Sequence, residues 1–386
     1  MSAQSQPRTG IELQSRTFLD AGLYLMADNE TKMQLVIDAG PQGTGRSGHG
    51  HADALSVLLS GGGRRWLVDS GTFRYVSNSD ERAKFRGTSA HNTLRVDCID
   101  QAEPAGPFAW SAIPRVKVDR WLVGNSFEYF EGSHDGYSRL PGPVNHRRCV
   151  FLLKNKFWLV RDVAEGTGTH ELEIFWHFAS DLKLRNENSA FIAESAAKGD
   201  AAGSASLIMQ TCGDAAWASS LETAQISPAY GTACSAPVAR QRASTSLPAD
   251  SAVLLMPQSR NAKMGEFSAI TESGESIVRA YRYLANHEDH CFFFAKINQP
   301  WECGPWSSDA QFLYCRLEAG RLVHVIVVAG GFCKWRGSEV VTLQHKVERF
   351  EWLRRGSKVT TSSSDDTAIQ YSLPHELVCS DPVVEK

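Results

Sequence analysis

The chain has 386 residues, of which 42% are hydrophobic and 22% charged, and its formal net charge at pH 7 is −3. This length is enough for one large domain or two ordinary domains with a buried core, and the near-neutral charge argues against a nucleic-acid-binding protein. No apolar stretch is long enough to cross a bilayer, and the first residues lack the apolar segment of a signal peptide. We therefore expect no nucleic-acid partner and no membrane partner.

Short strand-like runs separated by turn residues dominate the chain, and helical periodicity is scarce. In chain order, strands are predicted over residues 34–38, 55–59, 66–68, 93–96, 127–130, 149–153, 157–160, 171–176, 311–315 and 322–328. Two pairs of these runs predict hairpins, one around residues 154–156 and one around residues 318–320. A single short helix is predicted over residues 79–85.

This pattern predicts an all-β protein built as a large multi-stranded antiparallel β-sandwich with a smaller C-terminal β-sheet region. We place an N-terminal tail at 1–17, the sandwich at 18–260 and the C-terminal region at 261–386. The stretch 186–250 is rich in Ala, Ser and Gly, so we expect irregular excursions there, with an edge strand at 205–209.

The cysteines indicate reduced, buried thiols rather than a disulfide framework. There are nine of them, an odd number, they never form a Cys-x-x-Cys motif, and several lie inside apolar runs.

The most informative pattern is a series of histidines and an aspartate within the first hundred residues. His49 and His51 are one residue apart, so on a strand they point to the same side, and Asp69 and His91 follow at the ends of other predicted strands. Imidazole and carboxylate ligands together suit zinc better than calcium or magnesium. The alternative is a set of hydrogen-bonded polar residues near a sheet edge.

The same region resembles the heparinase II/III family of polysaccharide lyases. The matching segments are DAGLY at 20–24, HGHADALS at 49–56, LVDSGTFRY at 67–75, FRGTSAHNT at 85–93, HRRCVF at 146–151 and FWLVRD at 157–162. The resemblance covers roughly the first half of the chain. Members of this family place a helical toroid before a β-sandwich; here the sandwich motifs begin near residue 18, so we expect this polypeptide to lack the toroid.

The resemblance also implies roles for single residues. His51, Asp69 and His91 match the family's zinc ligands, and that zinc is mainly structural. His49 matches a residue of the active-site cleft that contacts the uronic acid, the alternative being a solvent-facing histidine. Arg74 is a candidate for binding a substrate carboxylate, or else a surface arginine paired with an acid.

Several further residues are placed near the site on weaker grounds. Tyr75 and Tyr230 are expected either to line a sugar site or to pack as ordinary aromatics. Arg86 and Asn92 flank the zinc motif, and we expect them to order its loop.

The reaction implied by the resemblance is β-elimination on a uronic-acid-containing polysaccharide. In the family the toroid supplies most of the acid and base, so this chain is expected to contribute only the sandwich wall of the active site. The expected partners are an acidic polysaccharide and either a separately encoded toroid chain or further copies of this chain. The alternatives are a non-catalytic polysaccharide-binding or interaction module and a metallo-hydrolase. The last is disfavoured because Ala54 follows Asp53 where the metallo-β-lactamase signature has a histidine.

The sequence leaves the polysaccharide open among heparin, heparan sulfate, alginate, hyaluronan and a bacterial exopolysaccharide. The near-neutral charge favours an unsulfated uronic-acid polymer. The resemblance favours a periplasmic or secreted protein.

Overall fold

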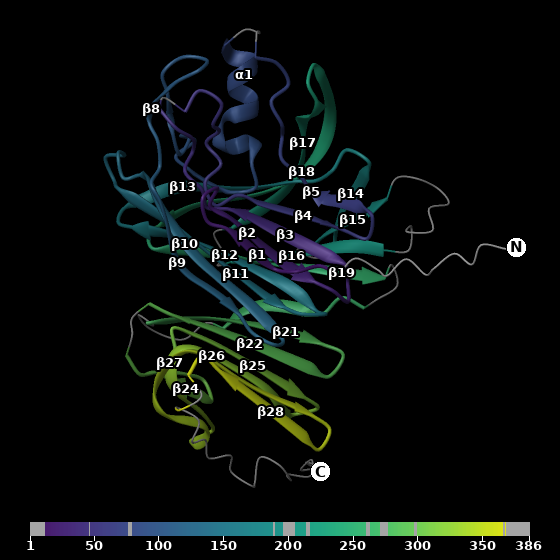
Figure 1. The fold of residues 1–386 in the computed structure, drawn as a ribbon, viewed down its shortest axis with the longest axis vertical. Helices are drawn as coiled ribbons and strands as arrows, with labels where there is room; N and C mark the ends of the chain where they lie inside the picture. Colours follow the sequence, from purple (N-terminus) through teal and green to yellow (C-terminus); the bar gives the residue numbers. More distant parts are fainter. Residues whose placement is uncertain are drawn as a thin grey trace, which may run out of the picture. The chain divides into compact units, whose positions relative to one another are not determined.

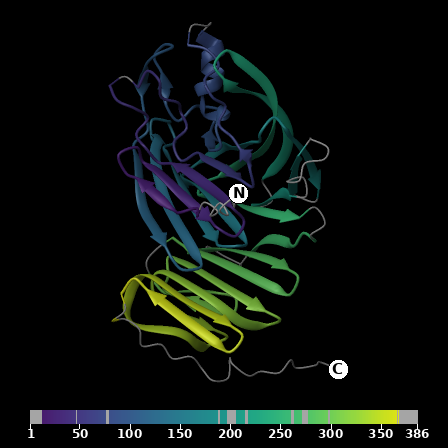
Figure 2. The ribbon, with the colours of Figure 1, turned by 45° about the vertical axis from the view of Figure 1, so that its right-hand side comes forward.

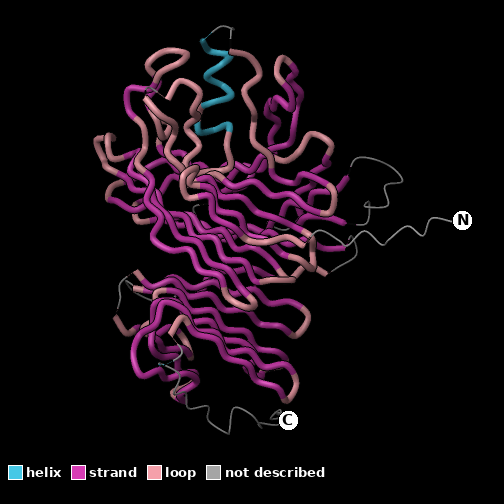
Figure 3. The backbone as a smooth tube through the Cα atoms, viewed as in Figure 1, coloured by secondary structure: helices cyan, strands magenta, loops and turns pink. Residues whose placement is uncertain are grey.

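The structure is a computed structural model that describes residues 12–45, 47–75, 79–187, 190–195, 205–213, 217–259, 263–270, 277–296, 299–365 and 367. Figure 3 shows these residues to be almost entirely strand and loop, with α1 (Ser79–Arg86) as the α-helix among them. The predicted all-β class is therefore confirmed. The chain forms two compact units, residues 1–121, 128–210 and 215–260 in the first and residues 122–127, 211–214 and 261–386 in the second.

Three antiparallel sheets make up most of the first unit (Figure 1). The first sheet runs β1 (Arg16–Phe18), β2 (Leu23–Asp28), β3 (Met33–Asp38), β4 (Val57–Gly61), β5 (Arg64–Leu67). The second runs β14 (Leu182–Glu187), β15 (Ala190–Ser195), β16 (Ala205–Gly213), β19 (Ala249–Ser259), β12 (Phe157–Gly166), β11 (Val144–Leu153), β10 (Phe127–Tyr137), β9 (Val116–Val123). The third runs β17 (Ala218–Ala229), β18 (Thr232–Ser246), β13 (Thr169–His177), β6 (Leu94–Val96).

One continuous hydrophobic core joins these three sheets. It includes Leu35 from the first sheet, Trp158 and Val160 from the second, and Ile174 and Trp176 from the third, all fully buried. Packing of sheet faces against one another is the arrangement that alternating apolar strands require. Outside the sheets, a 3₁₀ turn η1 (Thr88–Ala90) follows α1, and β7 (Glu103–Pro104) pairs with β8 (Trp110–Ala112).

The second unit is built on a single curled sheet (Figure 2). Its order is β20 (Glu266–Ile270), β21 (Val278–Ala285), β22 (Glu288–Ala295), β25 (Phe312–Glu318), β26 (Arg321–Trp335), β24 (Trp306–Ser308), β23 (Trp301–Cys303). The long strand β27 (Ser338–Arg355) also pairs with β26, and β28 (Lys358–Ser363) pairs with β27. This unit has its own core, with Phe293, Leu313, Val325 and Phe350 fully buried.

Both predicted hairpins are confirmed. β11 and β12 pair from Leu153 and Phe157 outward, and the turn between them has Asn155 at φ +68°. β25 and β26 pair across a turn in which Gly320 has φ +78°. Asparagine and glycine tolerate this left-handed conformation, which is why the turns fall at these residues.

The prediction of irregular structure over residues 186–250 is wrong for the described part of that stretch. Residues 218–229 and 232–246 form the long hairpin β17–β18. Residues 205–213 form β16, an inner strand between β15 and β19 rather than an edge strand. Pairing with the neighbouring strands overrides the weak strand propensity of alanine and serine.

The cysteines agree with the prediction of free thiols. Among the described residues Cys149, Cys212, Cys291 and four others form no disulfide and most of them are buried, while Cys98, also outside any disulfide, is exposed; Cys379 lies outside the described residues. None of the described helices is long and apolar enough to span a membrane.

Candidate metal and active site

Three loops of the first unit bring His51, Asp69 and His91 together. Their ligand atoms all lie within 4.8 Å of one another. His51 precedes β4, Asp69 follows the end of β5, and His91 follows η1. The expectation that the two histidines of the His-Gly-His motif lie on a strand is wrong, since residues 47–56 are irregular.

Two glycines allow these loops to approach their neighbours. A Cβ atom at Gly50, between the two histidines, would lie 1.9 Å from the carbonyl oxygen of Gln42. Gly71 has φ +70°, and a Cβ atom there would lie 2.3 Å from the carbonyl oxygen of Ser227 in β17. Only glycine fits both positions, so the motif glycines set the paths of the loops that carry His51 and Asp69.

Asp69 and His91 form a close pair, with 2.6 Å between the Asp69 Oδ2 and His91 Nδ1 atoms. Burial disfavours the charged imidazole of His91, but the Asp69 carboxylate outweighs it and raises the pKa of His91 to about 9. Burial also opposes the Asp69 charge, yet His91 lowers the pKa of Asp69 to about 2. Burial, reinforced by the charge of His91, lowers the pKa of His51 to about 4. The cluster thus holds one positive charge against one carboxylate, with a neutral His51 beside them.

These three side chains fit a divalent cation. The His91 Nε2 atom is buried and has no hydrogen-bond partner among the described residues. His51 is already neutral and Asp69 already ionised at pH 7, which are the forms that bind metal. A cation bound at His91 Nε2 would displace the proton that the charged ring carries on that atom, and Nδ1 could still donate to Asp69. The structure therefore places a His₂Asp set where a metal ion can bind.

His49 lies beside this cluster and lines the same cavity. The cavity measures about 280 Å³, and its walls include Gln42, His49, His51, Asp53 and Thr72. The His49 ring is exposed and has no hydrogen-bond partner in the described parts of the chain. Both polar atoms of the Gln42 amide are buried without a protein partner among these residues, so a ligand in the cavity could satisfy them.

An aromatic surface, formed by Tyr75, Phe108 and Tyr230, adjoins His49. The Tyr75 ring centroid lies 5.1 Å from that of His49, 5.7 Å from that of Tyr230 and 6.4 Å from that of Phe108. The Arg82 guanidinium lies over the rings of Tyr75 and Phe108, at 4.9 and 4.6 Å from their centroids. All three aromatic side chains are exposed, at 37%, 45% and 64% for Tyr75, Phe108 and Tyr230, so each has surface available to a ligand.

Arg74 lies next to this surface. Its guanidinium rests 4.7 Å from the centroid of the Phe73 ring and is exposed. Among the described residues no acidic side chain pairs with it, which leaves its donors available for an anionic ligand.

Helix α1 orders the loop that carries Phe108. Arg82 donates hydrogen bonds to the carbonyl oxygens of Pro107 and Gly48, and Arg86 donates to those of Gly106 and Pro107. In Figures 1 and 2 the helix stands beside the β17–β18 hairpin, whose turn carries Tyr230. The prediction was that Arg86 orders the loop of the metal motif; its side chain instead bonds the loop at residues 106–107. Arg82 was not predicted, although its four-residue spacing from Arg86 places both on one helix face.

Arg148 lies beneath the metal cluster and holds two of its loops. It is fully buried and donates hydrogen bonds to the carbonyl oxygens of Leu55, at 2.7 Å, and Asn92, at 2.6 Å. Its remaining donors form a two-point pair with Asp162, at 2.7 and 2.8 Å. Because Asn92 follows His91 directly, this arginine fixes the backbone next to a metal-ligand candidate.

Asn92 continues this network through its side chain. Its Nδ2 atom donates to the carbonyl oxygens of Val57 and Val68, and its Oδ1 atom accepts a hydrogen bond from the backbone N–H of His177. The predicted ordering role of Asn92 therefore agrees with the structure, since one amide joins β13 to the segments on either side of the cluster.

Two further histidines complete the network. The backbone N–H of Gly136 donates to His134 Nδ1, so His134 Nε2 carries the proton and donates to His146 Nδ1 at 3.0 Å. His146 Nε2 then donates to Asp162 at 2.7 Å. Burial lowers the pKa of both histidines, which agrees with neutral rings. The chain of donors and acceptors is consistent along its whole length, as a buried polar network requires.

Comparison with known proteins places the chain in a family. Residues 11–269 match the family described as heparinase II/III-like, C-terminal, and the chain belongs to it. Over 174 residues the chain is 26% identical to the heparin-sulfate lyase of Pedobacter heparinus, which covers 43% of this chain and 24% of that protein.

Solved structures show the same fold. A heparan sulfate lyase from Pedobacter heparinus matches with a TM-score of 0.57 and 18% identity, over 70% of this chain and 41% of that chain. A heparinase III structure matches with a TM-score of 0.60 and 18% identity, over 74% of this chain and 43% of that one. The chain thus spans about a quarter of the length of the curated lyase and about two fifths of the solved chains.

Proposed function

We propose that this chain forms the sandwich wall of a polysaccharide lyase active site, acting by β-elimination on a uronic-acid-containing polysaccharide. The observation that carries the proposal is the position of His49. Its exposed ring, without a protein partner among the described residues, lies between the metal-ligand candidates and the aromatic surface. Family membership supports the reaction class.

In this proposal each part of the site has one task. β-Elimination removes the ring proton next to the uronate carboxylate, so that carboxylate must be neutralised to make the proton acidic. Arg74 offers an exposed guanidinium for it, and His49 contacts the same sugar near the bond that breaks. Tyr75 and Tyr230 stack against neighbouring sugars, since an aromatic face suits the apolar face of a pyranose ring.

We further propose that His51, Asp69 and His91 hold zinc. Two imidazoles and one carboxylate match a zinc site better than a calcium or magnesium site. Bound there, the ion would chiefly hold the three loops in place and supply positive charge beneath the cavity. The buried network through Arg148 and Asn92 would support the ligands from below.

The proposal includes a contribution from outside these residues. The cavity of about 280 Å³ is lined by His49, and no tyrosine is among the described residues that line it. The family resemblance implies that a helical toroid supplies the base and the acid of the reaction. We expect that toroid to come from a second polypeptide or from further sequence.

The test is ultraviolet detection of unsaturated uronate on heparan sulfate, hyaluronan and alginate. The purified chain is assayed alone and with a helical toroid chain of the kind that the family resemblance implies. His345, an exposed histidine of the second unit, supplies the control variant. The proposal is supported if either assay shows activity, His49→Ala abolishes that activity and His345→Ala preserves it. Folded, zinc-loaded protein that never forms unsaturated uronate would contradict it.

Polysaccharide binding without cleavage is the second candidate function. The exposed aromatic surface with the exposed Arg74 favours it, because these groups would retain an acidic glycan without any catalytic group. Retention on a uronate column with no product formed would select this candidate, and loss of retention in Tyr230→Ala would locate the binding.

A further inference from the structure

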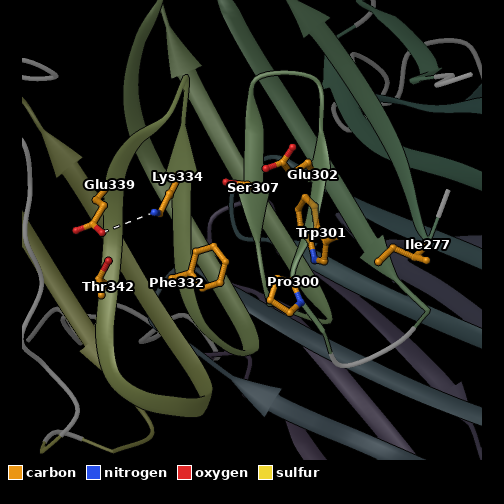
Figure 4. A pocket seen from close by; sticks show the side chains of 9 residues that line it. All are labelled: Ile277, Pro300, Trp301, Glu302, Ser307, Phe332, Lys334, Glu339 and Thr342. Atoms are coloured by element: carbon orange, nitrogen blue, oxygen red, sulfur yellow. Dashed lines mark ion pairs between the residues drawn. The ribbon is translucent and has the colours of Figure 1, made fainter.

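A larger pocket, of about 750 Å³, lies on the sheet of the second unit (Figure 4). One row of side chains crosses four strands there, because Glu302 pairs with Ser307, Ser307 with Lys334, and Lys334 with Glu339. Paired residues in adjacent strands point to the same face of a sheet. The row therefore forms a continuous polar surface along the pocket.

Aromatic groups flank this row. Phe332 lies two residues before Lys334 on β26, so both side chains face the pocket. The Phe332 ring is half-buried and contacts no other aromatic ring within the described parts of the chain. Trp301 faces the same opening from β23 and is held rigidly, since its ring stacks on Phe293 at 5.3 Å and its Nε1 donates to the carbonyl oxygen of Ala310.

Several polar groups in the pocket have unused hydrogen-bonding capacity. The Glu302 carboxylate is exposed and forms no ion pair with any described residue. The Thr342 hydroxyl is buried and has no hydrogen-bond partner among these residues. Lys334 and Glu339 are 3.8 Å apart and partly exposed, so their ion pair is weak and leaves the Lys334 ammonium able to donate to a ligand as well.

The charges indicate what kind of ligand fits. The pocket contains two carboxylates, Glu302 and Glu339, and one ammonium group, Lys334. This balance repels a polyuronate, whereas an uncharged ligand meets no such cost. Hydroxyl groups both donate and accept, and so can satisfy carboxylate, ammonium and threonine hydroxyl together. The volume is within the range of sites that enclose small organic ligands.

We propose that this pocket binds an uncharged oligosaccharide segment, with one sugar ring stacked on Phe332 and its hydroxyl groups bound by Glu302 and Thr342. This site is separate from the proposed lyase site in residues and in ligand charge. It does not depend on that proposal, because every residue that forms it belongs to the second unit.

Isothermal titration of the full chain tests the proposal. The probes are uncharged hexasaccharides of β-1,4-glucose, β-1,4-mannose and α-1,4-glucose, with a hexauronate for comparison. At least one uncharged probe should bind, with a Kd between roughly 10 μM and 1 mM. Phe332→Ala should weaken that binding at least about tenfold, Glu302→Gln should weaken it severalfold, and Phe332→Tyr should retain it.

The exposed Phe18→Ala variant is the matched control and should bind as the unchanged chain does. Because Glu302 is exposed, we expect Glu302→Gln to fold, so this variant still tests the proposal if Phe332→Ala fails to fold. The proposal is overturned if no uncharged probe binds at about 5 mM, if Glu302→Gln and Phe332→Ala both bind normally, or if the hexauronate binds with an affinity that Phe332→Ala lowers.

Discussion

Replacing Asp162 with asparagine tests the buried network beneath the metal cluster. Asp162 accepts two hydrogen bonds from Arg148 and one from His146, all between 2.7 and 2.8 Å. The asparagine side chain has the same shape but carries no charge and presents N–H donors toward one of these partners. The guanidinium of Arg148, which is fully buried, then has no counter-charge.

The expected loss of unfolding free energy follows from these contacts. A hydrogen bond to a charged group contributes about 1.5–3 kcal/mol. With its amide oxygen at the Oδ1 position, the asparagine keeps the bonds from Arg148 Nε and His146 and loses the one from Arg148 Nη2. The lost counter-charge is the larger cost, since breaking a buried ion pair by removing one partner costs about 3–5 kcal/mol. We therefore expect Asp162→Asn to destabilise the first unit by about 3–5 kcal/mol.

Urea unfolding followed by tryptophan fluorescence measures this change. Asp135→Asn is the control, because Asp135 pairs with Arg115 on the surface and its loss should cost no more than about 1 kcal/mol. Zinc affinity should also fall in Asp162→Asn, by about 10- to 100-fold, since Arg148 would hold the loop of His91 less firmly. A loss below about 1 kcal/mol with unchanged zinc affinity would refute the reasoning.

Four further predictions concern the site. Asp69→Asn should abolish stoichiometric zinc binding, measured by metal analysis after dialysis, and should remove the rise in Tm that zinc produces. His49→Ala should lower kcat for unsaturated-uronate formation by at least about 100-fold without changing Tm, because its ring is exposed. Tyr75→Ala should raise KM more than it lowers kcat, as expected for a residue that stacks with the sugar. Burial lowers the pKa of His177 from 6.5 to about 4, so as pH falls the His177 imidazole is protonated in the unfolded chain before it is protonated in the folded chain, and stability is lost from about pH 6.5 toward pH 4. His177 should account for about 2 kcal/mol of the unfolding free energy lost between pH 7 and pH 5. Urea titrations of His177→Gln at both pH values should show a loss smaller by that amount.

The sequence was sufficient to predict elements whose signals are local. The β11–β12 and β25–β26 hairpins were predicted because apolar runs flank turn residues that tolerate positive φ. The β17–β18 hairpin was not, because its alanine and serine residues show no alternation of large apolar and polar side chains. Its strands form because β13 offers a long pairing partner, which is a property of the tertiary structure.

The metal-ligand candidates were found for a partly wrong reason. Strand alternation suggested that His49 and His51 share one side, but both lie in a loop. His51 enters the cluster and His49 faces the cavity because Gly50 lets the loop approach Gln42 closely. The prediction of the metal ligands rested on the order of the sequence motifs. The paths of the loops that carry these residues depend on glycine positions, and the need for glycine is known only once the segment that faces each one is known.

Arg148 shows most clearly why the network could not be predicted. It follows Arg147 in the sequence, and the pair resembles a short basic run on the surface. On β11 the two side chains point to opposite faces; Arg147 reaches Asp119 and Glu165 at partly exposed positions, whereas Arg148 is fully buried. Alternation indicates that one of two adjacent strand residues faces inward but not which one, because the following residues of β11 are buried on both faces. The choice is decided by Asp162, fourteen positions away, and by carbonyl oxygens from loops more than fifty residues away. A buried arginine needs all of these partners at once, so only the assembled fold identifies it as a support of the site.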